Sequence, residues 1–139
     1  MPKTKIKEDA LPDLTSLASW VRLNAKMEVD KEQENVLVCV EGTREAKARP
    51  LMKKLGYADI PRHLVSLQRR CGKTSLGKPN KGMMLFFPLS IGSGPESIGS
   101  GNIHVAGEDL QPGSYIQLTE DLELDTQDAQ LDCLIVLLP

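Results

Sequence analysis

The sequence predicts an α+β domain, mainly antiparallel β-sheet of about six strands with two short helices in the middle of the chain. Short apolar runs rich in β-branched residues recur along the chain and are separated by Gly, Pro and Asn turns. The clearest helical periodicity lies in the middle of the chain. A length of 139 residues and an apolar content of 40% suit one domain with one core.

The N-terminal part predicts an arm followed by a hairpin. Residues 1–12 are polar and are expected to form a mobile arm, so the domain should span residues 13–139. From Val21 to Asp30 apolar and polar residues alternate without a break, which favours a half-buried strand. Residues 35–41 are β-branched and are predicted to pair with it. A competing helical spacing is present in Leu14, Leu17, Ala18 and Val21.

The middle of the chain predicts the two helices. Pro50 is not tolerated deep inside a helix, so the first helix is expected to begin or kink near it and to end at Gly56. Asp59 suits the N-cap of a second helix that covers residues 59–71. Along this second helix one face is apolar, at Ile60, Leu64, Leu67 and Cys71. The opposite face carries Arg62, Ser66, Arg69 and Lys73, and a loop rich in Gly and Lys follows over Cys71–Gly82.

The rest of the chain predicts β-structure. The expected strands are Met83–Leu89, Asn102–Val105, Ser114–Leu118, Leu122–Leu124 and Leu131–Leu138. The last of them is either a central strand of the protein's own sheet or a strand that adds to a neighbouring copy. Between the first two, Ser90–Gly94 is repeated as Ser97–Gly101. This repeat predicts a flexible hairpin tip or a gating loop.

Charge is the most informative feature for function. Residues 44–81 contain eleven Lys and Arg against two acids, whereas residues 82–139 contain nine acids and no basic side chain. The net charge of −2 therefore conceals two blocks of opposite sign. The middle block should attract phosphate or acidic protein, and the C-terminal block should attract basic surfaces.

Catalytic motifs are absent or incomplete. Gly72, Lys73 and Thr74 resemble the end of a Walker A loop, but Leu67 occupies the position of an earlier required glycine. Cys71 is the only candidate nucleophile, and a helix over 59–71 would turn His63 away from it. His63 and His104 alone do not form a metal-ligand pattern. The sequence therefore predicts no enzyme, no cofactor and no metal site.

Cysteine usage and hydropathy indicate the setting. Cys39, Cys71 and Cys133 have no short spacing, which favours a reducing, intracellular compartment, cytoplasmic or nuclear. The longest apolar runs are far shorter than the roughly 20 residues of a transmembrane helix. Aromatic residues make up only 4% of the chain, which argues against base-stacking platforms.

These observations lead to a hypothesis of non-enzymatic nucleic-acid binding. RNA or DNA would be held through its phosphates by Arg62, Arg69, Arg70, Lys73, Lys78 and Lys81. The β-rich remainder would be the scaffold and would self-associate into a homo-oligomer. The alternative is a structural assembly or adaptor protein, such as a viral coat- or matrix-like subunit, in which basic and acidic surfaces of different copies pair. Both hypotheses require that the acids of the same chain leave the basic block free.

Overall fold

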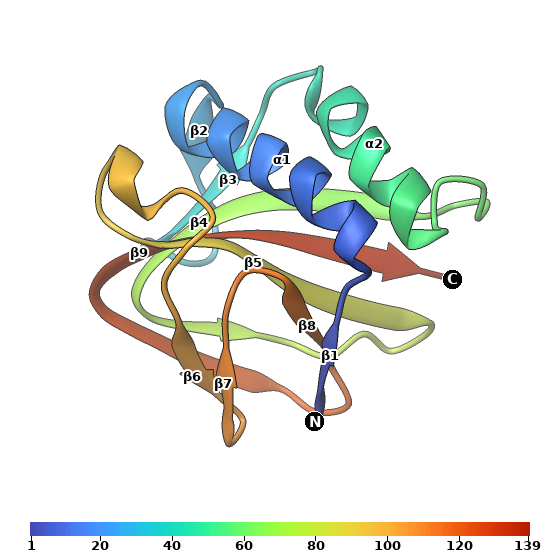
Figure 1. The fold of residues 1–139 in the computed structure, drawn as a ribbon. Coiled ribbons are helices and arrows are strands. Elements are labelled where there is room, and N and C mark those ends of the chain that lie inside the picture. The colour runs from blue at the N-terminus through green and yellow to red at the C-terminus, as the bar shows by residue number, and fades with distance from the viewer.

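Two long antiparallel strands, β4 (Leu64–Leu76) and β9 (Leu122–Leu138), form the centre of the fold in the computed structural model, which describes residues 1–139 (Figure 1). They belong to one seven-stranded sheet with the order β1-β8-β5-β9-β4-β3-β2. Its other strands are β1 (Lys3–Lys5), β2 (Met27–Val29), β3 (Val36–Cys39), β5 (Met83–Gly92) and β8 (Ser114–Gln117). A separate two-stranded hairpin consists of β6 (Ile103–Val105) and β7 (Glu108–Leu110).

The two faces of the sheet are covered differently. Helices α1 (Leu11–Leu23) and α2 (Arg44–Leu55) lie over one face, and the β6–β7 hairpin covers part of the other (Figure 1). Each face has its own apolar core, and consecutive residues of one strand enter different cores, as Phe87 and Phe86 do. The turns η1 (Glu8–Ala10) and η2 (Pro95–Ser97) are short 3₁₀ segments. Neither helix is long and apolar enough to cross a membrane.

The predicted α+β class with a mainly antiparallel sheet is confirmed, and the sheet has seven strands instead of about six. Three predicted strands, Met83–Leu89, Asn102–Val105 and Ser114–Leu118, correspond to β5, β6 and β8. The two segments Leu122–Leu124 and Leu131–Leu138 are parts of a single strand, β9. This strand pairs with β4 on one side and with β5 on the other, so it is a central strand of the chain's own sheet.

The N-terminal third follows the helical alternative. Helix α1 extends to Leu23, so the alternation from Val21 to Asp30 is realised only in β2, which pairs with β3. The helical spacing prevails because Leu14, Leu17, Ala18 and Val21 all pack into the core beneath α1. Although composition predicts an arm over residues 1–12, β1 pairs with β8, and Ile6 and Ala10 are buried.

The prediction of a helix over residues 59–71 is wrong. Residues from Leu64 onward form β4, which pairs with β9 along its length. The long apolar segment of β9 needs a strand on each side to satisfy its backbone polar groups, and this long-range pairing overrides the local helical periodicity. Leu64, assigned to the apolar face of the helix, is 58% exposed in the strand.

The first helix is longer than predicted but ends at the predicted residue. Helix α2 begins at Arg44 and contains Pro50. Proline has no N–H, so the carbonyl of Ala46 loses its helical hydrogen bond. Both residues are exposed, so this carbonyl lies on the solvent side. At its end Gly56 adopts a φ of 85°, and the N–H groups of Gly56 and Tyr57 donate to the carbonyls of Lys53 and Met52. This is the Schellman arrangement that favours glycine.

The glycine-serine repeat is a packed loop and not a flexible tip. The backbone N–H of Ile91 donates to the Ser100 carbonyl at 2.9 Å, and the N–H of Gly99 donates to Oγ of Ser90 at 3.0 Å. Gly101 has a φ of +93°, and a Cβ atom there would lie 2.1 Å from the carbonyl oxygen of Ile91. The loop returns so closely along β5 that only glycine fits at this point.

Replacing Gly101 by alanine is therefore expected to destabilise the protein more than Gly107→Ala. Gly107 also has a positive φ, of +80°, but a Cβ there meets nothing within 4 Å. Gly107→Ala should cost about 1–2 kcal/mol for left-handed backbone, and the clash in Gly101→Ala should add about 1–3 kcal/mol. Urea unfolding of both variants measures the difference. Equal losses would mean that the loop moves away from β5 without cost.

Candidate functional site

A buried ionic cluster lies where α1, β4 and β9 meet. The carboxylate of Asp132 is fully buried and accepts hydrogen bonds from Nε of Arg22 and Nε of Arg69, each at 2.7 Å. Nη2 of Arg69 also donates to the carbonyl of Val21 at 3.2 Å. We call this group, Arg22, Asp132 and Arg69, the arginine-aspartate cluster. Because Arg69 belongs to it, its guanidinium is already paired within the chain.

Arg22 extends this cluster to the glycine-serine repeat. Its Nη1 donates to the carbonyl of Gly92 at 2.9 Å and to Oγ of Ser97 at 2.8 Å. The Ser97 hydroxyl in turn donates to the carbonyl of Gly94 at 2.8 Å. The first helix, two central strands and the repeat loop are thus joined by one set of charge-assisted hydrogen bonds.

Arg70 is buried on the opposite face of the same strand. Only 2% of its surface is exposed. Its Nη1 donates to Oγ1 of Thr74 and to the carbonyl of Ser75, both at 3.1 Å, and its Nη2 donates to Oε1 of Gln68 at 2.8 Å. The guanidinium therefore braces the bend of β4 and is not available to an external phosphate.

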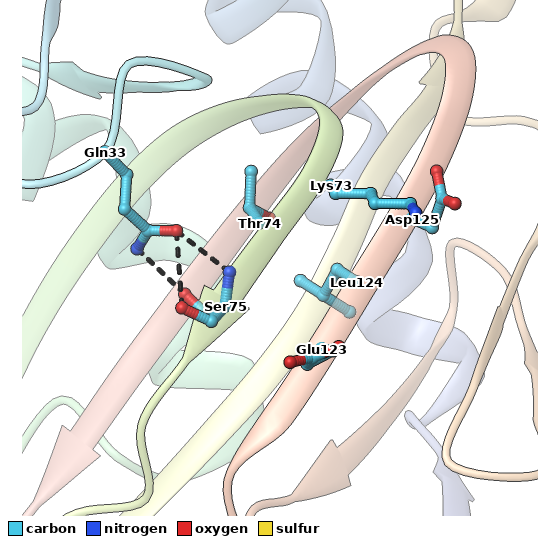
Figure 2. Close-up of a pocket in the computed structure, with 7 residues that line it drawn as sticks. All are labelled: Gln33, Lys73, Thr74, Ser75, Glu123, Leu124 and Asp125. Atoms are coloured by element: carbon cyan, nitrogen blue, oxygen red, sulfur yellow. Dashed lines mark hydrogen bonds between the residues drawn. The ribbon is translucent and has the colours of Figure 1, made fainter.

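Lys73 is exposed but faces an acid. It lies opposite Asp125 in the β4–β9 register, and Figure 2 shows its side chain extending toward that residue. A groove of about 430 Å³ runs over these strands, and the amide of Gln33 at its edge is already bonded to the backbone N–H and carbonyl of Ser75, each at 2.9 Å (Figure 2). Cross-strand pairs of this kind are usual on an exposed sheet face.

The remaining predicted residues do not join a common surface. Arg62 precedes β4, whereas Lys78 and Lys81 follow it, so they lie at opposite ends of a 13-residue strand. The backbone N–H of Lys78 is bonded to a carboxylate oxygen of Asp121 at 2.9 Å. Of the six residues, Arg69 and Arg70 are thus hydrogen-bonded inside the fold, and Lys73 faces an acid. The other three lie at the two ends of β4.

The six residues therefore do not form one phosphate-binding surface, and the hypothesis of nucleic-acid binding through them is wrong. Within the chain, Arg69 of the basic block pairs with Asp132 and Lys73 lies opposite Asp125, which argues against the alternative that the two blocks pair between copies. From Leu131 to Leu137 both edges of β9 are paired, with β4 and with β5, so this segment has no free edge for a neighbour's sheet. A homo-oligomer formed in another way stays a prediction.

The cysteines and His104 also form no reactive centre. Cys133 is fully buried, and burial raises the pKa of its thiol from 9.0 to about 12. Cys71 is partly exposed at the bulge of β4 and has no histidine among its hydrogen-bond partners. Nδ1 of His104 lies 3.1 Å from a carboxylate oxygen of Asp109 on the exposed hairpin. No three His, Cys, Asp or Glu side chains come together as a metal site.

A different cluster of polar side chains gathers between α2 and the start of β4. A cleft of about 350 Å³ opens there, and we call it the turn cleft. The helix contributes Glu45, Arg49, Met52 and Lys53, and the segment from the helix end into β4 contributes Ala58, Asp59, His63 and Val65. Residues 45, 49 and 53 are spaced by four and therefore lie on one face of α2.

The histidine of the turn cleft is held by a tight turn. The carbonyl of Ile60 accepts a hydrogen bond from the backbone N–H of His63 at 3.4 Å and lies 2.7 Å from its ring Nδ1. A carbonyl only accepts, so Nδ1 carries the hydrogen and, in the neutral ring, Nε2 has a free lone pair. The turn thus fixes one tautomer of the neutral imidazole ring.

The charged groups of the turn cleft are not paired with one another. Arg49, Lys53, Glu45 and Asp59 form no ion pair in the structure, whose three acid–base contacts all lie elsewhere. Unpaired charges of both signs around a histidine can bind a ligand that has an anionic group and hydrogen-bond donors.

Sequence reasoning named His63 but missed this cleft. On a helix over 59–71 His63 lies one turn from Asp59, but nothing in the sequence places that helix against residues 45–53 of α2. In the structure Pro61 lies in a turn instead of a first helical turn, and the chain reverses so that His63 faces the helix. The signal available was the pair Ile60-Pro61, since the residue before proline disfavours helical backbone.

The comparisons with known proteins concern the fold. No family model and no curated protein matches this sequence. Among solved structures, the polyketide cyclase RemF from Streptomyces resistomycificus is 13% identical, with 84% of this chain and 75% of that chain covered and a TM-score of 0.48. A sugar phosphate isomerase of the cupin superfamily, from Silicibacter pomeroyi, is 10% identical, with 81% of this chain and 70% of that chain covered and a TM-score of 0.46. Ectoine synthase from P. lautus is 13% identical, with 85% and 73% covered and a TM-score of 0.45.

These three neighbours are described as enzymes, and none of the three as nucleic-acid-binding or as a viral structural protein. The predicted non-enzymatic, RNA-binding or coat-like protein is not matched by any of these three descriptions. Likenesses at this level do not assign an activity to this chain.

Asp132→Asn is expected to lower the free energy of unfolding by about 3–5 kcal/mol, because it leaves two buried guanidinium groups without their counter-charge. Asp128→Asn on the same strand is the control, since Asp128 is exposed and its loss should change stability by less than about 0.5 kcal/mol. Chemical denaturation of both variants measures the values. Equal stability of the two variants would show that the cluster contributes nothing.

Stability is also expected to fall at alkaline pH through Cys133. Its pKa is about 12 in the folded state against 9.0 without burial, so between these values only the unfolded chain loses the proton. The contribution is complete below pH 9 and should decline by about 1.4 kcal/mol per pH unit up to pH 12. Urea unfolding of the wild type and of Cys133→Ala at pH 8, 10 and 11 measures the difference in slope. Parallel slopes would contradict the prediction.

Proposed function

We propose that this protein binds a small hydroxylated anion in the turn cleft and that His63 exchanges a proton with it. The observation that supports this most is the contact of 2.7 Å between Nδ1 of His63 and the Ile60 carbonyl. It orients the ring and leaves Nε2 as a proton acceptor beside charged side chains of both signs.

In this proposal the side chains of the turn cleft have three roles: hydrogen-bond donor, hydrogen-bond acceptor and proton-exchanging group. Arg49 and Lys53 project from one face of α2 and supply donors for a phosphate or carboxylate group. Glu45 and Asp59 accept hydrogen bonds from hydroxyl groups of the same ligand. His63 removes a proton from carbon or oxygen, or returns one, once the ligand is fixed between these groups.

The size of the cleft limits the ligand. A volume of about 350 Å³ lies near the lower end of pockets that hold small molecules. Met52 and Val65 are the apolar part of its lining, and the remaining side chains, Ala58 apart, are charged or ionisable. This composition favours a short polar molecule over a lipid or an extended aromatic ligand.

The test is an NMR titration with four probes: glycerol 3-phosphate, glycerate, inorganic phosphate and glycerol. The hydroxylated anions should shift the amide signals of residues 45–53 and 58–65, inorganic phosphate should bind more weakly, and glycerol should not bind. The side-chain ¹⁵N signals of His63 in the neutral ring should show a protonated Nδ1 and an unprotonated Nε2.

Variants separate the contributions. Arg49→Gln should weaken binding of glycerol 3-phosphate about tenfold or more, because a hydrogen bond to a charged group contributes about 1.5–3 kcal/mol. Lys54→Gln is the matched control: Lys54 is exposed on the same helix and does not line the cleft. His63→Asn keeps a donor for the Ile60 carbonyl and removes Nε2. Equal affinities of Arg49→Gln and Lys54→Gln, or signal shifts outside the cleft, would refute the proposal.

A further inference from the structure

The turn that carries His63 contains a residue in an unfavourable backbone conformation. Residues Ile60 to His63 form a turn closed by the hydrogen bond from the His63 N–H to the Ile60 carbonyl, with Pro61 at its second position. Arg62, at the third position, has a φ of 63°. Proline followed by a positive φ matches a type II turn, which strongly favours glycine at the third position.

The side chain of Arg62 does not contribute to the fold. It is exposed and forms no hydrogen bond or ion pair with any part of the chain. By contrast, Arg22, Arg69 and Arg70 are each held by several acceptors. A positive φ also occurs at the non-glycine residues Ala106 and Gln127, so this conformation alone assigns no role. At Arg62 it coincides with a charged side chain that has no partner in the fold, which suggests a requirement outside stability.

The position of Arg62 suggests what that requirement is. It lies directly before His63 and three residues after Asp59, both of which line the turn cleft. Arg49 and Lys53 supply cations from the helix wall of the cleft, whereas the turn supplies no other cation than Arg62. An anion bound near His63 would then meet positive charge from both walls.

We infer that Arg62 is a ligand-binding residue of the turn cleft whose guanidinium closes over the anionic group, a role that rests on the function proposed above. A planar guanidinium gives two parallel hydrogen bonds to a phosphate or carboxylate, which fixes the orientation of the ligand as well as its charge. The left-handed backbone at Arg62 is then the cost of presenting this group next to the proton-transfer atom of His63.

Arg62→Gly tests the inference because stability and binding should change in opposite directions. Glycine adopts the positive φ without strain, so the melting temperature should stay the same or rise by up to about 3 °C. The dissociation constant of glycerol 3-phosphate should nevertheless rise about tenfold. Arg62→Lys should keep part of the affinity, since it keeps the charge but not the planar fork. Lys78→Gln is the control, because it removes one exposed cation at the far end of β4 and should not change the affinity.

The outcomes separate the two proposals. If Arg49→Gln weakens binding and Arg62→Gly does not, the turn cleft is the site and Arg62 takes no part in it. If Arg62→Gly lowers the melting temperature and the affinity together, Arg62 acts through the fold, and the inference is wrong. If the wild type does not bind any of the anionic probes, the proposed function fails and the role of Arg62 fails with it.

Discussion

The carboxylate of Asp132 is the point on which the arrangement of the chain depends. It sits fully buried on the central strand β9 and is flanked by the guanidinium groups of Arg22 from α1 and Arg69 from β4. Burying three charges is costly, and the cost is offset only where each group is completely hydrogen-bonded, as Arg22 is by the Gly92 carbonyl and the Ser97 hydroxyl. The cluster therefore fixes the helix layer, the sheet and the repeat loop relative to one another.

The same cluster explains why the charge pattern of the sequence misleads. Seen as a linear sequence, Arg69 and Arg70 are the middle of a basic block, and Asp132 belongs to a distant acidic one. In the sheet, β4 and β9 are neighbours, and Arg69 is directly opposite Asp132. Because consecutive strand residues face opposite sides, the side chain of Arg70 lies on the other face of the sheet. There it donates hydrogen bonds to Thr74 and Ser75 at the bend of β4. At Arg69 and Lys73 the two blocks thus face each other across neighbouring strands of the same chain.

The sequence was sufficient for those elements whose signal is local. The β-branched and apolar runs predicted β5, β8 and two separate segments of β9, and Gly56 marked the end of α2. It failed where two periodicities overlap: Val21 to Asp30 alternates like a strand although α1 extends to Leu23, and Leu64 and Leu67 are spaced like a helix although they lie in β4. Both errors were decided by partners far away in the chain. The wrong assignment of residues 59–71 also prevented prediction of the site. In the structure a turn, and not a helix, at residues 59–63 brings His63 to the turn cleft.

The separation of β4 and β9 along the chain has a consequence for how the protein folds. The residues paired between them are 46 to 73 positions apart, from Leu76 with Leu122 to Leu64 with Leu137. Joining them closes loops of that length before any of the ladder's hydrogen bonds form, which is an entropic barrier typical of slow-folding β-proteins. Until these strands pair, the sheet that separates the two apolar cores is not complete. The chain is therefore expected to reach its native state in one late, cooperative event and to expose aggregation-prone strands before it.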